Sequence, residues 1–109
     1  YLAPLYANNL GQTITVNLSK DQYVSLGKIP TQEHISGIEI EVTGQTNSNF
    51  GIGISNTDAL IHHARIKGGK KVDFIYKNDW YTDSLFLVFD TENNENGRLE
   101  IEYRFLGMN

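Results

Sequence analysis

Apolar and polar residues alternate along most of this chain with the period of two that is typical of half-buried β-strands. Ile38, Ile40 and Val42 alternate with polar residues, and the stretch from Leu99 to Phe105 follows the same rule. No window of helical length carries an apolar stripe with a period of 3.6 residues. Clusters of glycine, asparagine and proline separate the strands. The predicted strands are residues 13–18, 22–26, 38–44, 50–55, 60–67, 71–77, 85–90 and 98–105.

About eight short strands in a chain of 109 residues predict a single all-β domain over residues 1–109. The close spacing of the strands favours an antiparallel β-sandwich of jelly-roll type, and a small β-barrel is the structural alternative. Residues 1–10 lack the strand pattern, and we interpret them as a loose N-terminal arm.

The glycine pair Gly68-Gly69 predicts a hairpin between the strands on either side of it. A three-residue loop that begins at this pair places Ile66 opposite Val72. It also places His62 opposite Tyr76, so that the apolar residues share one face of the hairpin. The other face would be basic and exposed to solvent. That face would carry His63, Arg65, Lys67, Lys71, Asp73 and Lys77.

The segment 85–89 is apolar at every position (Leu-Phe-Leu-Val-Phe). A strand of this composition is typical of the centre of a sheet that is covered on both faces. The alternative is that one face of the strand remains open and contributes to an apolar binding cleft.

The only tryptophan, Trp80, is followed by Tyr81 in a polar segment between two apolar strands. A tryptophan is normally found in the apolar part of a sequence that forms the core. Because this pair lies among amide and carboxylate residues instead, we interpret it as two flat rings offered to a ligand. Asn78 and Asp79 could hydrogen-bond the edges of that ligand, and Tyr76 at the end of the strand could add a ring. The alternative is that Trp80 folds back over the edge of the sandwich and caps the core.

Composition narrows the function classes. A net charge of −4 argues against nucleic acid as a partner, and no apolar run is long enough to predict insertion into a membrane. Adjacent His62 and His63 point to opposite sides of a strand, and no paired acid and base is visible, so we expect no catalytic residues. The segment 90–97 resembles part of a calcium loop, but a solvated hairpin loop is the preferred interpretation, so no cofactor is expected.

Three features in order resemble the non-catalytic carbohydrate-binding modules of extracellular hydrolases that act on plant cell walls. They are the strand 38–44 ending in Thr-Gly, the glycine-rich strand 50–56, and the alternating closing strand 99–105. The resemblance spans most of the chain. It differs in having no tryptophan in residues 56–63 or in the last strand, which argues against a broad flat platform for crystalline cellulose.

The resemblance implies a secreted module that tethers a parent multi-domain enzyme to a soluble polysaccharide chain, such as a β-glucan or hemicellulose. The ligand-binding residues would be Trp80, Tyr81, Asn78, Asp79, Tyr76 and His63. Two alternatives stay open. Arg65 and Lys71 on the basic face could bind an acidic, pectin-like polysaccharide, or the domain could be an adhesin-like or structural sandwich that binds proteins. We expect a monomer.

Overall fold

The computed structural model describes residues 11–18, 23–56, 59–69, 71–91 and 97–108, and every regular element among them is a β-strand. Each strand is antiparallel to its hydrogen-bonded neighbours, which confirms the predicted antiparallel β-sandwich. The strands are β1 (Gln12–Asn17), β2 (Tyr23–Gly27), β3 (Glu33–Gln45), β4 (Phe50–Ser55), β5 (Leu60–Ile66), β6 (Lys71–Asp79), β7 (Ser84–Thr91) and β8 (Arg98–Met108).

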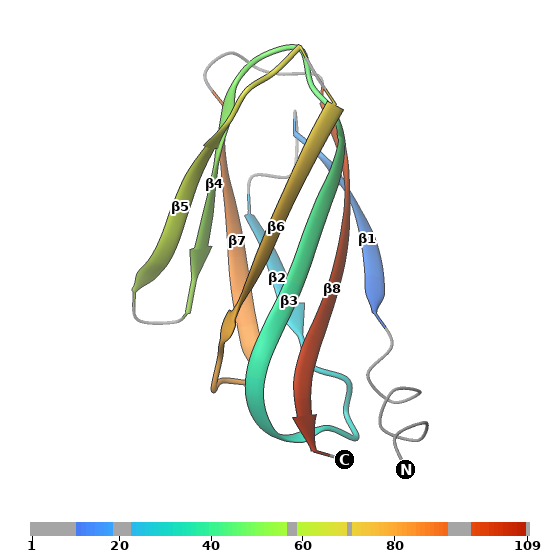
Figure 1. Cartoon of the computed structure of the whole chain (residues 1–109), viewed down its shortest axis with the longest axis vertical. Coiled ribbons are helices and arrows are strands. Elements are labelled where there is room, and N and C mark those ends of the chain that lie inside the picture. The colour runs from blue at the N-terminus through green and yellow to red at the C-terminus, as the bar shows by residue number, and fades with distance from the viewer. Residues whose placement is uncertain (1–10, 19–22, 57–58, 70, 92–96, 109) are drawn as a thin grey trace.

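The strands form two four-stranded sheets that pack face to face (Figure 1). Sheet A has the order β1-β8-β3-β6, and sheet B has the order β2-β7-β4-β5. The chain changes sheet at every connection except the β4–β5 hairpin, which is the jelly-roll arrangement. Two separate sheets exclude the barrel that the sequence left open.

The predicted hairpin between β5 and β6 is wrong, because the two strands belong to different sheets. β5 pairs with β4, and β6 pairs with β3. The connection between them is held against the β3–β4 loop: Gly68 N–H donates to Asn49 Oδ1 at 2.9 Å, and Gly69 N–H donates to Thr46 O at 2.8 Å. Gly69 has a φ of 76°, a conformation that favours glycine. The glycine pair therefore marks a crossover between sheets and not a tight turn.

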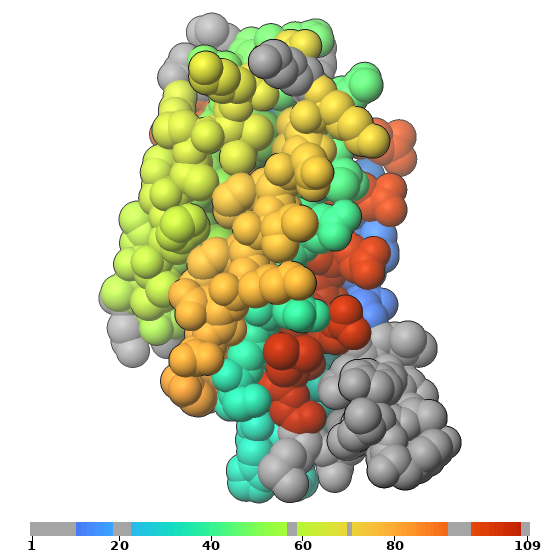
Figure 2. Space-filling view, in the orientation of Figure 1, coloured from blue at the N-terminus to red at the C-terminus, as the bar shows by residue number. Residues whose placement is uncertain are grey.

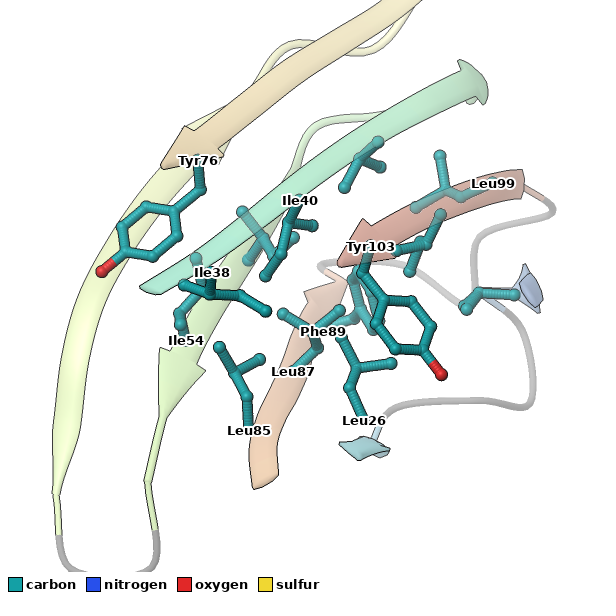
Figure 3. Packing of buried hydrophobic residues seen from close by; sticks show 14 of the residues in the cluster. Leu26, Ile38, Ile40, Ile54, Tyr76, Leu85, Leu87, Phe89, Leu99 and Tyr103 are labelled. Carbon is teal, nitrogen blue, oxygen red and sulfur yellow. The ribbon is translucent and has the colours of Figure 1, made fainter. Parts of the chain in front are cut away.

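The core lies between the sheets and consists of the inward half of each alternating strand. Figure 3 shows side chains of β3 and β8 pointing toward side chains of β2 and β7. Burial of each such leucine or isoleucine contributes roughly 1.5–3 kcal/mol. The fully buried large residues include Phe50, Ile52, Ile54, Ile38, Ile40, Leu85, Leu87, Leu99 and Ile101.

One edge of the sandwich is closed by side chains from both sheets. His62 of β5 and Tyr76 of β6 lie with their ring centroids 5.2 Å apart, although their strands do not pair. Figure 2 shows the side chains of β5 next to those of β6 along this edge. His62 and Tyr76 therefore meet across the gap between the two sheets and not as cross-strand neighbours in one hairpin, as the sequence had predicted.

Candidate functional site

Trp80 is buried, with 5% of its surface exposed, so the expectation of an exposed ring is wrong. The residue follows β6 directly, and its backbone N–H donates to Ser36 O at 3.3 Å. Its indole Nε1–H donates to Ser84 O at 3.0 Å, so both donors find backbone carbonyls of flanking strands. With its polar groups satisfied, the ring can join the core at no cost in unpaired donors. The folded-back cap, which was the alternative, is the arrangement that forms.

Tyr81 points to solvent, with 74% of its surface exposed. The polar residues expected beside it lie at the exposed end of β6, where they bond locally. Asn78 Nδ2 donates to Tyr76 Oη at 3.3 Å, and Asp79 N–H donates to Asn78 Oδ1 at 2.8 Å. The β6–β7 loop therefore offers a single exposed ring and no second one from Trp80.

The predicted basic face does not exist as one surface, because β5 and β6 lie in different sheets. Lys71 and Lys77 are on the exposed face of β6 in sheet A, with Asp73 between them. His63 and Arg65 lie on the outer face of sheet B, beside Gly51 of β4. The acidic-polysaccharide alternative assigned Arg65 and Lys71 to one basic face, and the fold puts these two residues on different sheets.

The outer face of sheet B carries the apolar surface that the loop lacks. Leu85, Leu87 and Phe89 of β7 are buried between the sheets, whereas Phe86 is partly covered and Val88 is 39% exposed on the opposite side. This strand therefore has one open apolar face, as in the second interpretation of segment 85–89.

An aromatic pair extends this surface onto β2. The rings of Tyr23 and Phe86 are stacked, with centroids 5.5 Å apart and an interplanar angle of 22°. Tyr23 lies opposite Val88 in the β2–β7 ladder and is 59% exposed. Tyr23, Phe86 and Val88 therefore form one patch across two adjacent strands.

Two glycines of β4 create a depression beside that patch. Gly51 and Gly53 occupy the outward positions of the strand, where a side chain would otherwise stand. Leu60 of β5 leans over Gly53, with Cδ1 3.1 Å from the place a Cβ would take, and the His63 Nε2 atom is 2.9 Å from the corresponding place on Gly51. Side chains of the edge strand therefore form a rim over a glycine floor.

The depression, which we call the Gly53 hollow, has a volume of about 610 Å³. Its apolar side is formed by Leu60, Ala59 and Val88. Its polar groups come from residues with hydroxyl, amide, imidazole and carboxylate side chains. These are Ser55, Asn56, His63 and Asp90.

Of the individually predicted binding residues, only His63 lies in this region. The second interpretation of segment 85–89 also covers Val88, and the other lining residues were missed. The available signal was the pattern Phe-Gly-Ile-Gly-Ile-Ser of residues 50–55, in which glycine takes each outward position of a strand. A floor without side chains on one sheet face is what that alternation produces.

The outer face of sheet A, which Figure 2 shows, is different in kind. Glu39 lies 3.1 Å from Arg104 Nε and 3.9 Å from Lys77 Nζ, and Glu41 stands opposite Glu102 in the β3–β8 ladder. Hollows also open on this sheet among the described residues. One of about 110 Å³ lies among these charges, and one of about 610 Å³ is lined mainly by residues with polar side chains. The second group comprises Thr15, Thr43, Gln45, Asn47, Arg98 and Glu100.

The described residues were also compared with the requirements of a metal site. They contain no group of three or more histidines, cysteines or carboxylates placed to share a metal ion. The core of the suggested calcium loop, residues 92–96, lies outside the described residues.

Burial raises the pKa of the Tyr103 hydroxyl, which donates to Gln12 Oε1 at 2.8 Å. Within the described ranges there is also no helix with the length and apolar character needed to cross a bilayer.

Comparison with known proteins adds little beyond this geometry. No protein-family model and no curated protein matches the chain. One solved structure that the chain matches is described as the crystal structure of infectious bursal disease virus VP2 subviral particle. The match has a TM-score of 0.29 and 11% sequence identity, and it covers 84% of this chain and 32% of that chain. This chain thus spans about a third of the length of that protein.

Proposed function

We propose that this domain is a non-catalytic carbohydrate-binding module whose ligand lies across the outer face of sheet B. The observation that supports the proposal is the Gly53 hollow with its adjoining Tyr23–Phe86 pair. The β6–β7 loop is not part of the proposed site, because Trp80 has no ring surface to offer.

The chemistry of a sugar explains why this surface is suitable. A pyranose has apolar C–H faces and polar hydroxyl edges, so its site needs apolar side chains beside hydrogen-bonding groups. Val88 and Leu60 supply the apolar contact, while Asn56 and Asp90 supply amide and carboxylate groups at the same hollow. Tyr23 extends the surface by one exposed ring, which suits a chain of several sugar units.

The proposed ligand is a soluble, neutral polysaccharide chain of the β-glucan or hemicellulose class. Each ring contact would supply about 0.5–1.5 kcal/mol, by analogy with aromatic pairs. Affinity for one chain would therefore be modest. This modest affinity would be sufficient in a secreted parent enzyme, because tethering raises the effective concentration of the polysaccharide near the catalytic domain.

A protein-binding function is the second candidate, and one observation favours it. Leu60 and Ile61 are large aliphatic residues exposed on the edge strand β5, at 60% and 47% respectively. Aliphatic side chains beside aromatic ones are common where proteins meet. In this case the sheet B face would bind a protein and no sugar.

Affinity electrophoresis against a panel of neutral and acidic polysaccharides separates the two candidates. Val88→Asp places a charge in the Gly53 hollow, and Ile75→Asp places the same charge at an exposed aliphatic residue on sheet A. We expect a neutral polysaccharide to retard the wild type and Ile75→Asp, and Val88→Asp to migrate freely. Tyr23→Ala should weaken the retardation.

Two results would overturn the proposal. If no polysaccharide retards the wild type, protein binding becomes the better explanation of the apolar face. If retardation is lost in Ile75→Asp and kept in Val88→Asp, sugar binds to sheet A instead.

A further inference from the structure

The two lateral edges of the sandwich differ in how they are protected. Each edge strand leaves one row of backbone N–H and C=O groups without a partner strand, which invites pairing with another chain. One edge is formed by β5 and β6, and the other by β1 and β2 (Figure 1).

The β5–β6 edge carries the features that normally block such pairing. β6 has the sequence Lys-Val-Asp-Phe-Ile-Tyr-Lys-Asn-Asp, with a charged residue at four of its nine positions. β5 contains Arg65 and two histidines, and its ladder with β4 is irregular between Ile54 and Ser55. Charges and bulges of this kind discourage strand addition.

The β1–β2 edge has none of these features within its strands. β1 reads Gln-Thr-Ile-Thr-Val-Asn and β2 reads Tyr-Val-Ser-Leu-Gly, with no charged residue and no proline. The β1–β8 register runs without interruption from Gln12 to Asn17. β1 is therefore a regular edge strand, rich in β-branched residues, with nothing in its sequence to repel a partner.

The hydrogen-bond pattern shows which groups of β1 are available. Leu18 N–H donates to Gly97 O at 2.8 Å and continues the β1–β8 ladder. Bonded pairs alternate along an antiparallel ladder, so Ile14 and Val16 also direct their N–H and C=O groups toward β8. Those of Thr13 and Thr15 point away from β8, where no described strand pairs with them.

We infer that β1 is a self-association edge, which pairs antiparallel with β1 of a second copy and joins the two A sheets into one. A two-fold axis at Ile14 sets Thr13 of each copy opposite Thr15 of the other. Both threonine pairs then exchange their outward N–H and C=O groups, as an isologous interface requires. Ile14, which is only partly buried against the core, packs on Ile14 of the second copy.

A second copy is the preferred occupant because the edge is complementary to itself. The paired strands contain no charge, so no repulsion opposes a symmetric register. The apolar residues remain on the inner face and the threonines on the outer face of the joined sheet. This inference replaces the sequence-based expectation of a monomer and is independent of the sugar site.

The association should be weak and reversible. A specific stable interface buries about 1,200 Å² or more in total, and one strand of six residues is a small part of that requirement. Dimers should therefore be populated at high protein concentration and dissociate on dilution.

Sedimentation equilibrium over a wide concentration range tests the inference with a matched pair of proline variants. Thr15→Pro removes an outward N–H of β1 and leaves every β1–β8 bond in place. Ile75→Pro does the same on β6, because Trp80 N–H bonds to Ser36 O and the alternation directs the Ile75 N–H outward. Thr15→Lys serves as a second variant if Thr15→Pro does not fold, since it adds charge at an exposed residue.

We expect the weight-average mass of the wild type and of Ile75→Pro to rise toward that of a dimer with concentration. Thr15→Pro and Thr15→Lys should keep the mass of a monomer under the same conditions. A wild type that is monomeric at every concentration overturns the inference. So does a dimer that Ile75→Pro abolishes and the Thr15 variants leave intact.

Discussion

The β6–β7 loop and the outer face of sheet B differ in how sequence relates to burial. In the polar loop a large aromatic residue is buried, whereas on the apolar strand β7 an aliphatic residue is exposed. The loop has a polar sequence, yet its tryptophan packs in the core, with its two N–H groups bonded to Ser36 and Ser84. β7 has an apolar sequence, yet Val88 is open to solvent because only one side of sheet B is covered. Local polarity therefore does not decide exposure in this fold; the packing of two sheets does.

The largest expected effect is at Trp80. Trp80→Ala should lower the free energy of unfolding by about 3–5 kcal/mol, because it removes a large buried ring and the indole N–H that donates to Ser84 O. Tyr81→Ala, one residue further, should change it by no more than about 0.5 kcal/mol. Urea denaturation measures both values. Similar losses for the two variants would contradict the assignment of one ring to the core and the other to solvent.

Adjacent residues of β7 test the other half of the comparison. Leu87 is fully buried and Val88 faces outward. Leu87→Ala should cost about 2–5 kcal/mol of stability, whereas Val88→Ala should cost about 0.5 kcal/mol or less. The same denaturation experiment applies. If Val88→Ala lowers the free energy of unfolding as much as Leu87→Ala does, Val88 is buried in solution and the outer face of sheet B is not open.

All eight strands and the sandwich could be predicted from the sequence. Alternation of apolar and polar residues, as at Ile38, Ile40 and Val42, is a local signal that each strand carries by itself. The prediction failed at the connection through Gly68-Gly69, since a turn and a crossover both use glycine. The position of β5 beside β4 is set by contacts distant in sequence, and it moved Arg65 away from Lys71. The exposure of Trp80 was predicted wrongly for a related reason, because its backbone N–H bonds to Ser36 of β3, a residue distant in sequence.

The stacked pair on sheet B should contribute a smaller, measurable amount to stability. A double-mutant cycle with Tyr23→Ala and Phe86→Ala should give a coupling energy of about 0.5–1.5 kcal/mol, given the ring separation of 5.5 Å. A cycle between Tyr81→Ala and Phe86→Ala serves as the control for rings that belong to different regions. A coupling indistinguishable from that control would show that the Tyr23 ring does not rest on Phe86 in solution.

A modest effect at neutral pH is expected at Tyr103, a buried aromatic residue that belongs to neither region. Tyr103→Phe removes the hydrogen bond to Gln12 and should cost about 1 kcal/mol. Burial raises the pKa of the Tyr103 hydroxyl above its ordinary value of 10.0. The unfolded chain then loses this proton at a lower pH than the folded chain.

Stability of the wild type should consequently fall as the pH rises above about 10. The contribution is complete below that pH and is lost progressively up to the raised pKa. In Tyr103→Phe this part of the alkaline decline should be absent, which thermal melts between neutral and alkaline pH would detect. Tyr81→Phe is the control, because its hydroxyl is on an exposed ring. If the two variants lose stability equally with rising pH, the Tyr103 hydroxyl is not shielded by the sandwich, and the division between buried and exposed rings fails at this position.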